Sequence, residues 1–215
     1  NFLLIKDFIK NYHPEVLRLF FLSTHYRSPI DYNDRSIEDS YSALYRLYYT
    51  LERVDDLEKN KQGVEPQKHK EADEYEKLFA EAMEDDFNTA LALSYIFELS
   101  KMINKLIDQK DENSSPIVFY SRNVMLGLAN TLGLLQDDFE TFESKEKERH
   151  LARLGLTAQK IEEMINERIE ARKNKNFKRA DEIREMLSRD GILLLDTPKG
   201  TEWRIKHTTI KEKDK

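Results

Sequence analysis

The sequence of 215 residues contains no cysteine, so disulfide bonds and thiolate metal sites cannot form within it. Its 6 glycines and 5 prolines are few for an all-β protein. No apolar run approaches the roughly 20 residues that a membrane span requires, and no signal peptide is visible. We therefore expect a cytoplasmic, mainly helical protein with no membrane partner.

Motifs for catalysis are also missing. No histidine is paired at four-residue spacing with a glutamate between, as zinc hydrolases require; the histidines are His13, His25, His69, His150 and His207. There is no glycine-rich nucleotide motif and no motif for a nucleophile. We therefore predict no catalytic residue and no metal site in this chain, which leaves binding as its role.

What the sequence does contain is an uneven distribution of charge. Its net charge is −6, yet residues 151–215 hold 16 Lys and Arg against 12 Asp and Glu, a net charge of +4. The segment 168–179 has six basic residues, a single acidic one and the aromatic ring of Phe177. Positive charge beside a ring that can stack is typical of proteins that hold single-stranded nucleic acid. The alternative is that the basic cluster is simply a solvated surface.

The first 136 residues predict a helical bundle. Apolar residues recur there at three- and four-residue spacing, which is typical of amphipathic helices. We expect Tyr41, Tyr45, Tyr48 and Tyr49 to pack mostly in the core, because their spacing follows one helical stripe. The expected helices begin at Pro14, run over 37–54 and 68–85, begin again at Asn88 or Thr89, and run over 118–132 to Gly133.

The C-terminal part differs in pattern. Residues 137–150 are densely charged and predict a solvated linker. Residues 151–215 predict two helices, the first capped by Thr157 and the second beginning near Asn176, followed by a short β-hairpin after Gly191. The predicted fold is therefore mainly α, with a bundle followed by a small α+β cap.

The C-terminal module resembles that of the cysteinyl-tRNA synthetases. The ending D-T-P-x-G-T-x-W over 196–203 is specific to that family, and two upstream runs resemble its bundle in the same order: HPEVLRLFFLSTHYRSPIDY at 13–32 and DDFNTALAL at 85–93. The resemblance further rests on Arg172, Phe177, Ala180-Asp181, Ile183-Arg184, Leu187, Gly191-Ile192 and Leu195.

This resemblance implies a division of labour. In this family Asn1 and Phe2 would directly follow the KMSKS signature, so a core that activates cysteine with ATP and binds zinc is expected upstream. The absence of an initial Met agrees with a start inside a larger protein. The chain alone is then expected to be inactive and to bind tRNA-Cys, with no DNA partner. The bundle would support the inside corner of the tRNA.

The family's pattern also assigns residues to the anticodon. The bases would be read by Arg172, Phe177, Asp181, Arg184 and Asp196, while the tRNA backbone would meet Lys173, Lys175, Lys178 and Arg179. The chemistry fits, because a carboxylate accepts from amino and imino groups of bases and arginine donates to their carbonyl and ring nitrogen atoms. Position 177 is often Trp in the family, so Phe177 offers a smaller stacking surface.

Three alternatives remain open. A cysteine ligase that acts on an amino sugar shares part of the bundle, but has no need of an anticodon module. A helical scaffold for another protein would carry the basic tail by coincidence. Within the module, Asp181 and Arg184 are also spaced to form an ordinary ion pair on the helix surface, and Trp203 is suited to the core.

Overall fold

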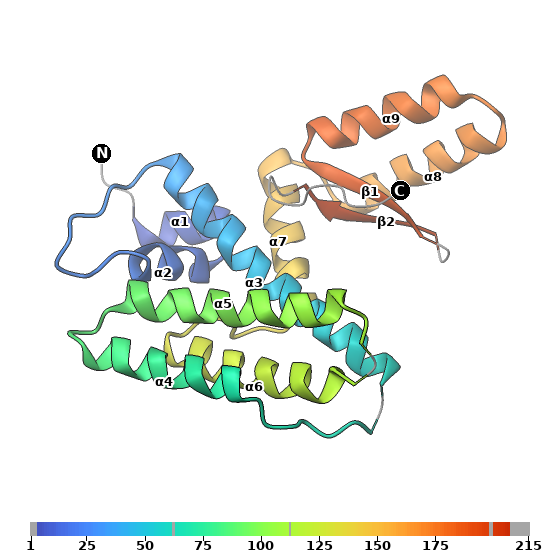
Figure 1. Cartoon of the computed structure of the whole chain (residues 1–215). Helices are drawn as coiled ribbons and strands as arrows, with labels where there is room; N and C mark the ends of the chain where they lie inside the picture. The colour runs from blue at the N-terminus through green and yellow to red at the C-terminus, as the bar shows by residue number, and fades with distance from the viewer. Residues whose placement is uncertain (1–3, 62, 112, 198–199, 207–215) are drawn as a thin grey trace. The chain divides into compact units, whose positions relative to one another are not determined.

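The computed structural model describes residues 4–61, 63–111, 113–197 and 200–206 (Figure 1). In these ranges the chain is mainly helical with one two-stranded antiparallel sheet, which confirms the predicted fold class. None of the described helices has the length and apolar composition needed to cross a bilayer. The elements are α1 (Ile5–Asn11), α2 (Pro14–Leu22), α3 (Asp34–Asn60), α4 (Lys70–Glu84), α5 (Thr89–Asp108), α6 (Ser115–Thr131), α7 (Phe139–Leu154), α8 (Ala158–Lys173), α9 (Phe177–Arg189), β1 (Ile192–Thr197) and β2 (Gly200–Ile205).

The chain folds as two compact units. One comprises residues 13–142, and the other combines the described residues of 1–12 with those of 143–215. The boundary between the units falls inside α7.

In the first unit, α3 is the longest helix and packs against α2, α5 and α6 (Figure 1). Asn33 begins α3 with a capping box, in which its side chain accepts from the Ser36 amide and the Ser36 hydroxyl accepts in return from the Asn33 amide. The buried face of α3 includes Tyr41, Tyr45 and Tyr48, as predicted, whereas Tyr49 is 37% exposed.

A buried carboxylate holds the loop after α6. Glu15 on α2 is only 3% exposed, and it accepts hydrogen bonds from the amides of Leu135 (2.8 Å) and Gln136 (3.0 Å) and from the Tyr48 hydroxyl (3.0 Å). Burial, reinforced by the charge of Glu15, raises the pKa of Tyr48 far above its ordinary value. Because these partners satisfy the carboxylate, Glu15 acts as a structural centre of this unit.

The prediction of a solvated linker over 137–150 is wrong, because α7 occupies most of this segment. Asp138 caps it by accepting from the Thr141 amide at 2.7 Å. Phe139 and Phe142, three residues apart, are both buried, and the Phe142 ring stacks on Tyr48 with centroids 4.0 Å apart. The many charges lie mainly on the other faces of the helix, and their number hid this short apolar stripe from the sequence pattern.

The second unit contains the module of α8, α9 and the hairpin, which Figure 1 shows side by side. Thr157 and Asn176 cap α8 and α9 as predicted, and Gly191 ends α9 at φ +71°. A Cβ at Gly191 would also lie 3.0 Å from the His150 ring, so a larger residue would both strain the backbone and displace that ring. In the hairpin Leu194 lies opposite Trp203. The core consists of Leu151, Ile161, Ile165, Ile183, Leu187, Ile192, Leu194 and Trp203.

Trp203 therefore belongs to the core, as its sequence pattern indicated. Trp203 is 9% exposed, and the Lys147 ammonium lies 4.8 Å from the centroid of its ring. Pro198 and Lys199, part of the predicted turn, lie outside the described residues.

Candidate functional site

The exposed face of α9 carries three chemically different side chains. Phe177, Asp181 and Arg184 follow each other at four- and three-residue spacing, so they share a face. All three residues are exposed, Phe177 to 60%. This face is separate from the buried stripe of α9, which consists of Ala180, Ile183 and Leu187.

Asp181 and Arg184 do not form the helix-surface ion pair that their spacing allows. In the described ranges, neither side chain makes a hydrogen bond or an ion pair. Their polar atoms are therefore open to solvent and available to a ligand. An aromatic ring, an acceptor and a donor on one helical face are the groups needed to stack on a base and bond its edge.

Asp196 lies in a different environment, because two arginines of α8 hold it. Arg168 donates to both carboxylate oxygens, at 2.9 Å and 2.8 Å. Arg172 donates to Oδ2 at 3.1 Å, and the Thr201 hydroxyl donates to Oδ1 at 2.8 Å. Each oxygen thus accepts two hydrogen bonds, which uses the acceptor capacity of the carboxylate. We call Arg168, Arg172, Asp196 and Thr201 the clamp.

Burial and charge explain the electrostatics of the clamp. Arg168 is 5% exposed, while the side chains of Asp196 and Arg172 are 51% and 53% exposed. Hydrogen bonds from Arg168, and then from Thr201, hold the pKa of Asp196 well below its ordinary value although partial burial opposes them. The same hydrogen bond raises the pKa of Arg168, so both groups stay ionised.

The clamp and the α9 face are electrostatically linked. The charge of Asp181 also raises the pKa of Arg168, which shows that this carboxylate lies within electrostatic range of the clamp. Among the predicted readers, Arg172 and Asp196 are therefore joined by a hydrogen bond, whereas Asp181 acts on the clamp only through its charge. Phe177 and Arg184 join them by their place on α9.

The four predicted backbone contacts divide into two pairs. Lys173 is bonded to Glu170 at 2.6 Å, and Arg179 is held by Glu167 at 2.8 Å and Glu182 at 3.3 Å. By contrast, two exposed lysines have no carboxylate partner among the described residues; they are Lys175 and Lys178. Only this second pair presents unneutralised charge.

Sequence reasoning counted Arg168 in the basic cluster but gave it no role. A signal was available, because Arg168 follows Ile161 and Ile165 on the apolar stripe of α8. A charged residue at a core-facing position predicts a buried partner. The identity of that partner, 28 residues away, required the fold.

In the described ranges no three His, Asp or Glu side chains gather that could hold a metal ion, and the sequence has no cysteine.

Comparison with known families agrees with this geometry. Residues 155–204 match the Cysteinyl-tRNA ligase anticodon binding domain, which covers α8, α9 and most of the hairpin. Residues 78–136 match the DALR domain, and residues 1–42 match the tRNA synthetases class I (C) catalytic domain. That last match ends inside α3, so the family boundary does not coincide with the compact unit that begins at residue 13.

Whole-chain comparison gives the same family. The chain is 40% identical over 213 residues to Cysteine–tRNA ligase of Geobacter metallireducens, covering 96% of this chain and 44% of that protein. It is 38% identical over 213 residues to the protein of that name from Desulfotalea psychrophila, covering 95% and 44%. It is 40% identical over 208 residues to that of Syntrophotalea carbinolica, covering 95% and 43%.

The chain thus spans less than half the length of the curated relatives that it matches. The three family matches follow one another along the chain, from a catalytic domain at 1–42 through the DALR domain at 78–136 to an anticodon-binding domain at 155–204. The chain therefore belongs to the cysteinyl-tRNA synthetase family, of which it represents a C-terminal part.

Proposed function

We propose that this chain binds tRNA-Cys and that the module of α8, α9 and the hairpin reads its anticodon. The observation that carries the proposal is the α9 face, where Phe177, Asp181 and Arg184 are exposed and make no ion pair among the described residues. A stacking ring together with an unpaired acceptor and an unpaired donor suits splayed bases of a single-stranded loop.

Each side chain has a distinct role in this proposal. The Phe177 ring stacks on a base, Asp181 accepts from an amino or imino group, and Arg184 donates to a carbonyl or ring nitrogen atom. Arg172 donates from the edge of the clamp, where Asp196 fixes its guanidinium at 3.1 Å. Since the acceptor sites of Asp196 are already used, we assign it to positioning Arg172 rather than to direct contact with a base.

The phosphate backbone is proposed to contact Lys175 and Lys178. Phosphate contacts supply affinity without sequence preference, and they need charge that is not already neutralised. For this reason Lys173 and Arg179, which have carboxylate partners, contribute less in the proposal than the sequence indicated.

The whole protein is proposed to be a cytoplasmic enzyme that joins cysteine to tRNA-Cys at the expense of ATP. ATP and zinc would then be bound by the upstream core rather than by the residues described above. The match of residues 155–204 to an anticodon-binding domain supports tRNA over the protein-scaffold alternative, and over the amino-sugar ligase, which needs no such module.

The test compares neighbouring carboxylates on α9. Asp181→Ala should reduce the preference for a GCA anticodon over a swapped one by about 1–3 kcal/mol while leaving the salt dependence unchanged. Glu182→Ala is the matched control, because Glu182 is an exposed neighbour that bonds Arg179. Both variants are titrated with cognate and anticodon-swapped tRNA across salt concentrations. Full retention of the preference by Asp181→Ala would refute the site, and binding of neither tRNA by the wild type would favour the scaffold.

A further inference from the structure

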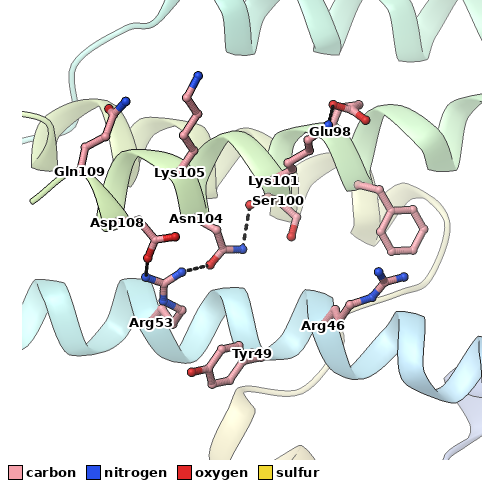
Figure 2. Close-up of a pocket in the computed structure, with 11 residues that line it drawn as sticks. Arg46, Tyr49, Arg53, Glu98, Ser100, Lys101, Asn104, Lys105, Asp108 and Gln109 are labelled. Carbon is pink, nitrogen blue, oxygen red and sulfur yellow. Dashed lines mark hydrogen bonds and ion pairs between the residues drawn. The ribbon is translucent and has the colours of Figure 1, made fainter. Parts of the chain in front are cut away.

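A small hollow lies between α4 and α5, which run side by side in the first unit (Figure 1). Its volume is about 300 Å³, and it is lined by His69 and Glu71 at the start of α4 and by Lys105 and Gln109 near the end of α5. Figure 2 shows Lys105 and Gln109 on the side of α5 that faces away from Arg53 of α3. A hollow of this size is at the lower end of the range of small-molecule pockets. We call it the α4/α5 hollow.

Part of its lining is apolar. Met102 is 9% exposed, and Leu106 and Tyr75 are partly buried beside it. Burial, followed by the charges of Glu71 and Glu98, raises the pKa of Tyr75. Both carboxylates of the hollow therefore act on the same hydroxyl, which stays protonated. The apolar side chains offer a surface that can cover an alkyl group.

The hollow also presents unpaired charges of both signs. Glu98 and Lys101 bond each other at 3.4 Å. Glu71 and Lys105, in contrast, make no ion pair and no side-chain hydrogen bond within the part of the chain that the structure describes. A ligand with one cationic and one anionic group can pair with both, whereas a ligand with a single charge would leave one of them unpaired.

A buried nitrogen at the hollow lacks a partner. Nδ1 of His69 is buried, and none of the described residues forms a hydrogen bond with it. Such an unpaired polar atom costs free energy, which a ligand can recover. Since nothing described bonds this nitrogen, rotation of the His69 side chain can turn it toward a ligand. His69 also precedes α4, which begins without a side-chain cap, so amides of its first turn lack a side-chain acceptor.

We propose that the α4/α5 hollow binds a free α-amino acid with an apolar side chain. Lys105 pairs with the ligand carboxylate, Glu71 pairs with its ammonium group, and the apolar lining around Met102 covers its side chain. Ion pairs at exposed positions each contribute little, so we expect a Kd on the order of 1–10 mM. The site lies in the first unit, and its test needs no tRNA.

The experiment uses L-leucine and two analogues that each lack one charged group. 4-Methylpentanoate lacks the ammonium group, and 3-methylbutylamine lacks the carboxylate. Each compound is titrated into the ¹⁵N-labelled chain, and the backbone amides are followed by NMR. Leucine should shift the amide signals of residues 69–75 and 98–109, and it should bind roughly two- to fivefold more tightly than either analogue.

Two variants assign the charges. Lys105→Ala should weaken the binding of leucine and of 4-methylpentanoate roughly two- to fivefold but leave that of 3-methylbutylamine unchanged. Glu71→Ala should weaken the binding of leucine and of 3-methylbutylamine to a similar extent, but not that of 4-methylpentanoate.

The matched controls are Arg35→Ala on α3 and Glu74→Ala on α4. Both remove an exposed charge outside the hollow that has no ion pair among the described residues. Leucine binding should be unchanged in both controls. Thermal unfolding of all four variants should stay at the wild-type temperature, since the four side chains are exposed.

Three outcomes would overturn the proposal. The first is that leucine shifts none of these amide signals at tenfold the expected Kd. The second is that leucine binds no more tightly than one of its analogues, or that inorganic phosphate competes with it at equal affinity, because the hollow would then recognise only one charge. The third is that the control variants lose as much affinity as Lys105→Ala and Glu71→Ala, because the two charges would then act only at long range.

Discussion

Each unit of this protein buries charged side chains, and two of them, Glu15 and Arg168, serve different purposes. In residues 13–142 the buried charge is Glu15, and its partners are two backbone amides and a buried tyrosine hydroxyl. In the C-terminal module it is Arg168, whose partner Asp196 is half exposed and also bonds the exposed Arg172.

The difference lies in where the hydrogen bonds end. Those of Glu15 end in the interior and fix the loop 134–137, so they serve stability. Those of Arg168 continue through Asp196 to a guanidinium at the surface, so they fix a group that can meet a ligand. A buried charge therefore acts as an internal staple in one unit and as a support for a binding surface in the other.

The largest effect is expected when the internal staple is removed. Glu15→Ala leaves the amides of Leu135 and Gln136 and the Tyr48 hydroxyl without their acceptor, which should cost roughly 3–5 kcal/mol of stability. Denaturant unfolding of the chain measures this loss. Glu15→Gln keeps one acceptor oxygen and should cost less. A loss below about 1 kcal/mol for Glu15→Ala would show that water replaces the carboxylate.

The clamp should respond unequally to the loss of its two members. Asp196→Ala leaves the buried Arg168 guanidinium without a partner and should cost about 2–3 kcal/mol of stability. The loss is moderated because the Asp196 side of the pair is half exposed to solvent. Arg168→Met leaves a carboxylate that water can reach and should cost only about 1 kcal/mol. Urea unfolding of both variants gives the comparison. Equal losses would mean that Arg168 becomes hydrated, contrary to its burial.

Acid should remove the contribution of the clamp selectively. Because the folded-state pKa of Asp196 lies below the unfolded value of about 3.9, its stabilisation is complete above that value and is lost as the pH falls toward the folded pKa. The stability difference between wild type and Asp196→Asn should therefore be constant from about pH 7 to pH 5 and shrink below about pH 4. Unfolding curves at each pH test this. A difference that grows in acid would contradict the lowered pKa.

The smallest effect concerns single surface cations of the module. Lys175→Ala should weaken the binding of all tRNAs about two- to threefold and make the salt slope shallower by about 0.7–0.9. Arg179→Ala should leave the slope nearly unchanged, because Glu167 and Glu182 already neutralise Arg179. Filter binding across salt measures both. Equal slopes for the two variants would show that ion pairing within the module does not limit its phosphate contacts.

Much of the fold follows from the sequence because it depends on neighbours within one turn of helix. Three- and four-residue spacing predicted the helices, Thr157 and Asn176 predicted two caps, and Gly191 predicted the end of α9. The exposed face of α9 is another such local feature, since the spacing of Phe177, Asp181 and Arg184 places them on the same side of the helix.

The prediction of a linker over 137–150 failed because charge density is an average over the segment. Two buried phenylalanines, Phe139 and Phe142, stabilise α7 through contacts with residues far away in the sequence. The average charge density indicates that most positions in the segment face solvent. It does not reveal that a narrow apolar stripe packs against another part of the fold.

By itself, the sequence determined the helical periods, the helix ends, the sign of charge in each region and the set of residues that face outward on α9. Only the tertiary structure decided which charges are paired. Arg168 pairs with Asp196, Arg179 pairs with Glu167, and Glu15 accepts from backbone amides 120 and 121 residues away. The reason is that composition gives the number of donors and acceptors, whereas packing sets which of them meet. Groups left over after packing, such as Asp181 and Arg184, are the ones that remain available to a partner.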